Sequence, residues 1–216
     1  MIKLKSLFLS VVCFVAFAFW TFLITIIDVK AIGPNGSAVG FAALNGYFHK
    51  LTGVNMWLYT VTDWLSLVPV FIMMGFAVLG LVQWFKRKNI LKVDFSILIL
   101  GVFYVITLAA YLLFEEVIIN YRPTLINGFL EASYPSSTTL LVLCVMPTAL
   151  IQFNLRIKTK PIRVLVEALI VAFTVFMVCG RILSGVHWLT DIIGGVLLSF
   201  GLVGTYKFVC GIRKER

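Results

Sequence analysis

Six long apolar segments constrain the fold of this 216-residue chain more than any other feature of its sequence. They cover residues 6–27, 60–85, 95–114, 137–153, 163–179 and 189–206. Each has about the 17–25 residues that a helix needs to cross the hydrocarbon core of a bilayer. Because no water is available there to satisfy backbone groups, the segments are expected to be α-helices. The sequence therefore predicts an all-α integral membrane bundle of six transmembrane helices, in one domain over residues 1–216.

The composition agrees with a membrane protein and excludes other classes. Hydrophobic residues make up 61% of the chain and charged residues 12%, whereas an ordinary soluble domain is roughly 45–50% apolar and about 25% charged. A secreted domain, a disordered chain and a cytosolic enzyme are therefore excluded. The segments also lack the alternation of polar and apolar residues that is typical of a transmembrane β-barrel.

The basic residues are distributed unequally, and this predicts the orientation. Of the 18 Lys and Arg residues, 14 lie at the chain ends or in the connections after the second and fourth segments. These are Lys3, Lys5, Lys86, Arg87, Lys88, Lys92, Arg156, Lys158, Lys160, Arg163, Lys207, Arg213, Lys214 and Arg216. Since Lys and Arg are retained on the cytoplasmic side, both termini are predicted to be cytoplasmic. The net charge of +9 is then topological, and we expect no nucleic-acid partner.

The first segment has an alternative interpretation as a signal peptide, because Lys3 and Lys5 precede it. Its length and the lack of a small-residue cleavage site after it favour a retained helix. Residues 29–59 would then form an external loop. Within that loop, residues 41–58 mix aromatic and polar side chains, a composition typical of a segment that lies in the membrane interface.

Polar residues that could bind an anion gather on the predicted outer side. Arg122 and Arg181 each lie at the outer end of an apolar segment, where an Arg is costly unless it has a partner or water. Ser136, Ser137 and Thr138 open the fourth segment. Hydroxyls and free N–H groups at a helix N-terminus form a site for an anion, although a Ser at this position can also simply cap the helix.

A histidine and an aspartate follow Arg181. His187 lies six residues after it, and Asp191 four residues further on. Residues four apart share one face of a helix. Asp191 could therefore accept the Nδ1–H of His187 and leave Nε2 free as a nucleophile or base. Two guanidinium groups near such a pair are suited to a phosphate.

These three clusters resemble the signature of the type 2 phosphatidic acid phosphatase superfamily, which consists of integral membrane lipid phosphatases. That signature reads Lys, six residues, Arg-Pro; then Pro-Ser-Gly-His; then Ser-Arg, five residues, His, three residues, Asp. The matching residues here are Arg122-Pro123, Pro135-Ser136-Ser137-Thr138, Gly180-Arg181, His187 and Asp191. The order and the spacings agree, and each cluster lies on the predicted outer side.

The resemblance implies a role for each matching residue. His187 would attack phosphorus and form a phosphohistidine, and Asp191 would orient it. Arg122 and Arg181 would hold the phosphoryl oxygens. Ser136 and the backbone N–H groups around Ser137 would complete the binding site for the developing negative charge. The resemblance implies no metal ion and no other cofactor.

Two positions depart from the signature. Glu115 stands where the family has Lys, with Glu116 beside it, and Thr138 stands where the family has the His that protonates the leaving group. An unprotonated alcohol leaves as an alkoxide, whose conjugate acid has a pKa of about 15–16 by analogy with water. A phosphate leaves far more easily, since its second pKa is about 6. The sequence therefore predicts a preference for a lipid diphosphate, such as a polyprenyl diphosphate, over a monoester.

The prediction is thus a lipid phosphatase of the cell membrane, with its site on the extracytoplasmic face and a lipid phosphate or diphosphate as substrate. Because of Glu115 and Thr138, two alternatives remain open. One is a lipid-phosphate binder or transporter that does not hydrolyse its ligand. The other is an enzyme that transfers phosphate between lipids. His49, in the external loop, is a further candidate for the missing acid.

Overall fold

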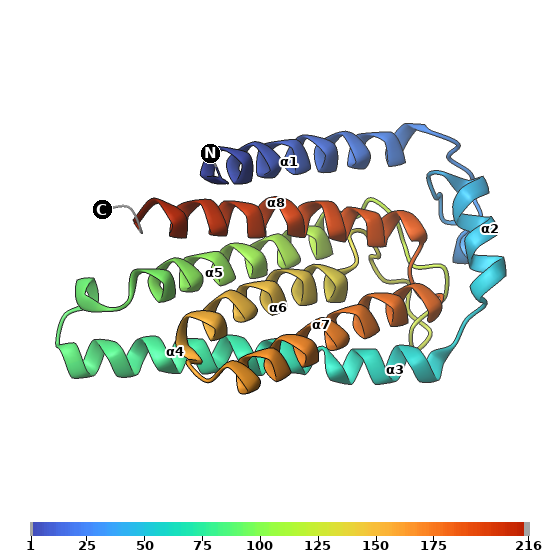
Figure 1. Cartoon of the computed structure of the whole chain (residues 1–216). Helices are drawn as coiled ribbons and strands as arrows, with labels where there is room; N and C mark the ends of the chain where they lie inside the picture. The colour runs from blue at the N-terminus through green and yellow to red at the C-terminus, as the bar shows by residue number, and fades with distance from the viewer. Residues whose placement is uncertain (1, 214–216) are drawn as a thin grey trace.

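The computed structural model describes residues 2–213, which fold into a bundle of long helices (Figure 1). The helices are α1 (Ile2–Ile26), α2 (Ala42–Thr52), α3 (Met56–Leu65), α4 (Leu67–Arg87), α5 (Phe95–Glu116), α6 (Ser137–Arg156), α7 (Lys160–Leu183) and α8 (Leu189–Arg213), with short 3-10 turns at Pro34–Gly36 and Ile90–Lys92. Within residues 2–213 there is no strand beyond isolated bridges. Lys214 and Arg216, two of the basic residues used to predict the orientation, lie outside the described residues.

The prediction of six membrane-spanning helices is confirmed for the described part of the chain. The apolar spans are Lys5–Ile26, Met56–Arg87, Phe95–Glu116, Ser137–Arg156, Lys160–Leu183 and Leu189–Gly211. The second span consists of α3 followed by α4, and it begins at Met56, so the connection before it is shorter than predicted. Several spans extend past the apolar segments because helix ends reach the polar interface, where charged side chains are tolerated.

Helices α6 and α8 form the centre of the bundle, and α1 packs along α8 (Figure 1). Close packing of α1 and α8 depends on small residues. A Cβ added to Gly201 would lie 2.8 Å from the Phe14 ring, and one added to Gly204 would lie 2.3 Å from Ser10 Oγ. Small residues at such contacts let membrane helices approach closely. The packing of α1 against α8 therefore helps to fix the position of α8.

The polar residues of the three sequence clusters gather at one end of the bundle. Helix α2 lies across this end, and the connection between α5 and α6 folds back into it (Figure 1). The start of α1 and the end of α8 are both at the opposite end. Five polar residues are buried at the α2 end: Arg122, Ser133, Arg181, His187 and Asp191. The fold thus gathers the residues of all three sequence clusters at a single place.

Candidate active site

Short irregular segments bring the site residues together from distant parts of the sequence. Arg122 lies in the connection after α5, Arg181 in the last turn of α7, and His187 in the turn before α8. That turn depends on Gly185, which has φ of +65°, and a Cβ there would lie 1.7 Å from Gly53 O. Gly185 is therefore needed both for its backbone conformation and for the close approach of the α2–α3 connection.

The two arginines lie near the same aromatic ring and are each paired with a carboxylate. The Arg122 and Arg181 guanidinium carbons lie 5.9 Å and 5.0 Å from the centre of the Tyr59 ring. Arg122 Nε lies 3.0 Å from Glu131 Oε2, and Arg181 Nη2 lies 2.9 Å from Asp63 Oδ1. The Asp63 contact is also a hydrogen bond, whereas the Glu131 contact is an ion pair without one, since Arg122 Nε has no hydrogen-bond partner among the described residues. Together with the aromatic ring, these contacts help to fix both side chains in position.

Arg181 retains donors that the protein does not satisfy. Its side chain is 2% exposed, yet neither Nε nor Nη1 has a hydrogen-bond partner among the described residues. Arg122 Nη1 lies 3.3 Å from His187 Nε2. A buried N–H group without an acceptor is costly, and a guanidinium offers its donors in a planar fork that suits phosphate oxygens. The site can therefore bind an anion next to His187 Nε2.

His187 and Asp191 are close but are not directly hydrogen bonded. His187 Nδ1 lies 3.9 Å from Asp191 Oδ2, and the hydroxyl of Ser133 lies between them, 3.1 Å from Nδ1 and 2.5 Å from Oδ2. Asp191 also accepts hydrogen bonds from the Asn120 side chain and from the backbone N–H of Trp188. The expected direct contact is absent because His187 precedes α8, so the helical spacing of four residues does not apply to it.

The hydroxyls of Ser136 and Thr138, at the start of α6, make different contacts. Ser136 Oγ is fully buried and accepts a hydrogen bond from Thr139 Oγ1. Thr138 Oγ1 accepts one from Arg181 Nη2. Ser136 is the N-cap residue, but its side chain makes no capping hydrogen bond. The first-turn N–H groups of this 20-residue helix therefore have no hydroxyl cap from Ser136, as anion binding requires.

The comparison with protein families agrees with this geometry. Residues 113–210 match the model of the PAP2 superfamily. The match covers somewhat less than half of the chain, which is therefore similar to the PAP2 superfamily over this region. The matched residues contain every site residue predicted from the sequence, from Glu115 to Asp191, whereas Tyr59 and Asp63 lie before the matched region.

A solved PAP2 protein shares the fold over nearly its whole length. It is described as a transmembrane PAP2-type phosphatidylglycerolphosphate phosphatase from Bacillus subtilis, with a TM-score of 0.65 and 19% sequence identity. The match covers 95% of this chain and 96% of that chain. At this identity the match shows a common fold. No curated protein matches the sequence.

Four residues of the candidate site were not predicted from the sequence. They are Tyr59, Asp63, Glu131 and Ser133. Ser133 carried a local signal, since it lies three residues before Ser136 in a run that ends in the PAP2-like Pro-Ser pair. Glu131 follows Arg122 by nine residues and pairs with it across a short turn, in which Arg122 N donates to Glu131 O. Tyr59 and Asp63 had no such signal, because they come from another helix.

Burial and charge keep the histidine of the candidate site neutral. Burial lowers the pKa of His187 well below its ordinary value of 6.5, and the positive charges of Arg122 and Arg181 lower it further. At neutral pH the imidazole is therefore unprotonated, so that the lone pair on one ring nitrogen is available. This protonation state is the one that a nucleophile requires.

We expect the acid limb of the pH profile of kcat/KM to lie below pH 6.5, because this limb reports groups of the free enzyme. As the pH falls, His187 stays neutral through the range in which an ordinary histidine becomes protonated. The measurement is phosphate release from a lipid diphosphate in detergent at several pH values. Loss of kcat/KM centred above pH 6.5 would contradict this assignment.

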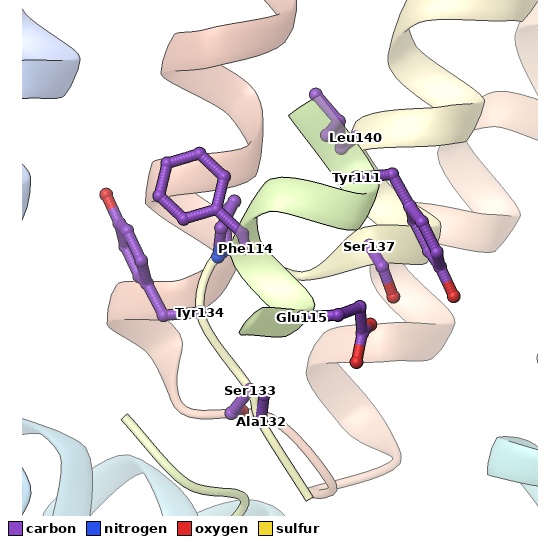
Figure 2. A pocket seen from close by; sticks show the side chains of 9 residues that line it. Tyr111, Phe114, Glu115, Ala132, Ser133, Tyr134, Ser137 and Leu140 are labelled. Atoms are coloured by element: carbon purple, nitrogen blue, oxygen red, sulfur yellow. The ribbon is translucent and has the colours of Figure 1, made fainter. Parts of the chain in front are cut away.

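Glu115, at the position of the PAP2 lysine, pairs with neither arginine among the described ion pairs. It lines a small cavity with Tyr111, Ser133 and Ser137 at the end of α5 (Figure 2). Its carboxylate is close enough to Arg122 and Glu131 for electrostatic interaction. Asp63 and Glu131, rather than Glu115, are therefore the carboxylates that hold the arginines.

The Glu115→Gln variant is expected to bind anionic substrate more tightly, with KM about two- to fivefold lower at low salt and kcat unchanged, because one nearby negative charge is removed. The effect should shrink at high ionic strength. Glu116→Gln is the matched control, since adjacent side chains on a helix project about 100° apart. An equal change in KM for both variants would show that the effect is not specific to the cavity.

Proposed function

We propose that this chain is a membrane lipid phosphatase that acts on a lipid diphosphate, such as a polyprenyl diphosphate, through a phosphohistidine at His187. The assignment as a PAP2-type lipid phosphatase is supported by the family match and by the transmembrane fold. The observation that carries the specific proposal is the contact between His187 Nε2 and Arg122 Nη1, together with the unpaired donors of Arg181, whose positive charge acts on His187. This arrangement supports attack on a bound phosphoryl group.

The proposed reaction has two steps. In the first, the lone pair of His187 Nε2 attacks phosphorus, and the bond from phosphorus to the leaving oxygen breaks with its electron pair on that oxygen. Arg122, Arg181 and the N–H groups of α6 stabilise the charge on the remaining oxygens. In the second step, water attacks the phosphohistidine, releases phosphate and restores the free imidazole.

The proposed preference for a diphosphate rests on Thr138. Its hydroxyl accepts a hydrogen bond from Arg181, and a hydroxyl cannot donate a proton to an alkoxide as a protonated histidine does. A lipid diphosphate releases a lipid phosphate, which needs little protonation because its second pKa is about 6. Loss of a general acid typically costs about 10²–10⁴ in rate, and this cost would fall mainly on monoesters.

The position of the site supports a substrate with its tail in the bilayer. An apolar groove of about 590 Å³ lies between α4 and α5, with Met73, Ala77 and Leu108 among its lining residues. Leu108, Tyr111 and Glu115 follow one another at spacings of three and four residues, so they lie on one face of α5. This face connects the groove to the cavity beside Ser133. The charge distribution supports an extracytoplasmic location for the site.

The test is a comparison of substrates that share one tail. Purified protein is given a prenyl diphosphate, the matching prenyl monophosphate and a phosphatidate, and phosphate release is measured for each. We expect the diphosphate to be hydrolysed fastest. Faster release from the phosphatidate or from the prenyl monophosphate would contradict the proposed preference.

A second candidate function is favoured by the same residue. Because Thr138 stands where the family has the proton-donating His, the site could hold a lipid phosphate without hydrolysing it, as a binder or transporter does. Phosphate transfer to a second lipid is the other alternative, and it would require added lipid alcohol as acceptor. Binding of a lipid diphosphate that is retained in His187→Gln, with no phosphate release by the wild type, would favour the binder.

A further inference from the structure

A single hydroxyl separates the histidine and the aspartate of this site. Ser133, His187 and Asp191 are all buried, with 2%, 6% and 0% exposure. We infer that Ser133 is a positioning residue for His187, and that its hydroxyl connects Nδ1 to the Asp191 carboxylate and fixes the ring with Nε2 unprotonated. The inference rests on the proposed function, because it assigns a role in the attack by Nε2.

The available protons determine the direction of each hydrogen bond. The ionised Asp191 carboxylate only accepts, and the Ser133 hydroxyl has one proton. At 2.5 Å from Oδ2, that proton is donated to Asp191. Ser133 Oγ therefore accepts at its other contact, and His187 Nδ1, at 3.1 Å, must carry the proton that is donated there.

The contact on the other side of the ring requires the same tautomer. Arg122 Nη1 lies 3.3 Å from His187 Nε2, and a guanidinium donates but never accepts. Nε2 must therefore accept, which it does only when unprotonated. Ser133 and Arg122 thus act on opposite nitrogens and favour the one neutral form in which Nε2 presents a lone pair towards the proposed phosphate site.

The backbone holds Ser133 and Arg122 in one short ladder. Ser133 N donates to Asn120 O at 2.9 Å, and Arg122 N donates to Glu131 O at 3.0 Å. The Asn120 side chain also donates to Asp191 Oδ1. The connection between α5 and α6 therefore sets the positions of both partners of His187 together, with Asp191 as their common anchor.

No proton has to move along this connection when the reaction starts. As the bond from Nε2 to phosphorus forms, the ring gains positive charge while its proton stays on Nδ1. Ser133 Oγ accepts that hydrogen bond, and its own proton remains directed at the negative carboxylate. Ser133 therefore stabilises the charged ring without contacting the substrate. We expect its loss to affect kcat more than KM.

The direct test is ¹⁵N NMR of the imidazole in detergent or nanodiscs. The chain has two histidines, so His49→Gln protein labelled with ¹⁵N-histidine reports His187 alone. We expect the Nδ1–H tautomer at neutral pH, and a mixture of tautomers after Ser133→Ala is added. A wild-type Nε2–H tautomer, or a spectrum unchanged by Ser133→Ala, would overturn the inference, and this readout does not require the protein to be an active phosphatase.

Kinetics provide the second readout. Ser133→Ala should lower kcat about 10–100-fold, by analogy with the loss of a hydrogen-bond partner that orients a metal-bound histidine. KM should change little, because the arginines bind the phosphate. Ser133→Thr keeps a hydroxyl and should restore most of kcat. Ser199→Ala is the control, because it removes a buried hydroxyl from α8 that donates to the backbone carbonyls of Leu140 and Gly195, away from His187.

The kinetic outcomes separate this inference from the proposed function. Wild-type kcat in Ser133→Ala, or equal losses in Ser133→Ala and Ser133→Thr with an unchanged tautomer, would overturn the role of Ser133. Absence of phosphate release from the wild type would instead contradict the proposed function, and the NMR result would still decide the tautomer.

Discussion

The His187→Gln variant is expected to lose phosphate release by about 10⁴–10⁶-fold, the scale seen when the nucleophile of a covalent mechanism is removed. Gln fills a similar space but offers no nucleophilic nitrogen. Arg122, Arg181 and the start of α6 would still bind the phosphate. We therefore expect binding of a lipid diphosphate to persist while phosphate release disappears. The measurement is turnover together with equilibrium binding of the same lipid.

His49→Gln is the matched control, because His49 is the other histidine of the chain. Its ring packs edge-on against Trp188, with centroids 5.5 Å apart, and burial lowers its pKa below the ordinary value. At neutral pH its imidazole is therefore uncharged and is too weak an acid to protonate a leaving group. We expect near-normal activity. A loss of monoester hydrolysis in this variant would instead identify His49 as the acid.

The Thr138→His variant is expected to gain activity on lipid monoesters, by up to about 10²–10⁴-fold, which is the usual contribution of a general acid. The substitution places a titratable group beside Arg181, at the start of α6. Hydrolysis of a lipid diphosphate should change much less, because its leaving group needs little protonation. The measurement is the ratio of kcat/KM for a prenyl monophosphate to that for the matching diphosphate.

The size of the gain also depends on Arg181. Its positive charge opposes protonation of a nearby imidazole, so the gain should be larger at pH 6 than at pH 8. Thr138→Asn is the control, because it adds a polar side chain that does not titrate. A ratio that stays the same in Thr138→His, or that rises equally in Thr138→Asn, would contradict the role assigned to this position.

The six spans and four central site residues could be predicted from the sequence for physical reasons. The bilayer imposes a length and an apolar composition on each span, so hydropathy locates the helices without knowledge of their packing. Arg122, Arg181, His187 and Asp191 lie at or near span ends, and ends on the same side of the membrane must meet at one face. Topology alone therefore indicated that these residues are neighbours.

The partners of those residues could not be predicted in the same way. Asp63 and Arg181 form an ion pair between two helices, although the two residues are 118 positions apart in sequence. No local spacing encodes that contact. The prediction of a direct His187–Asp191 bond assumed a continuous helix, whereas α8 begins at Leu189. The turn before α8 leaves room for Ser133, a residue from a different segment.

The proposed covalent phosphohistidine at His187 is tested most directly by trapping it. Wild-type protein is mixed with a lipid diphosphate carrying ³²P in its terminal phosphate and quenched in base, in which phosphohistidine is stable. Its peptides are then mapped by mass spectrometry. We expect label on His187, absent from His187→Gln and retained in His49→Gln. Phosphate release by the wild type without label on His187, or label on another residue, would contradict the proposal.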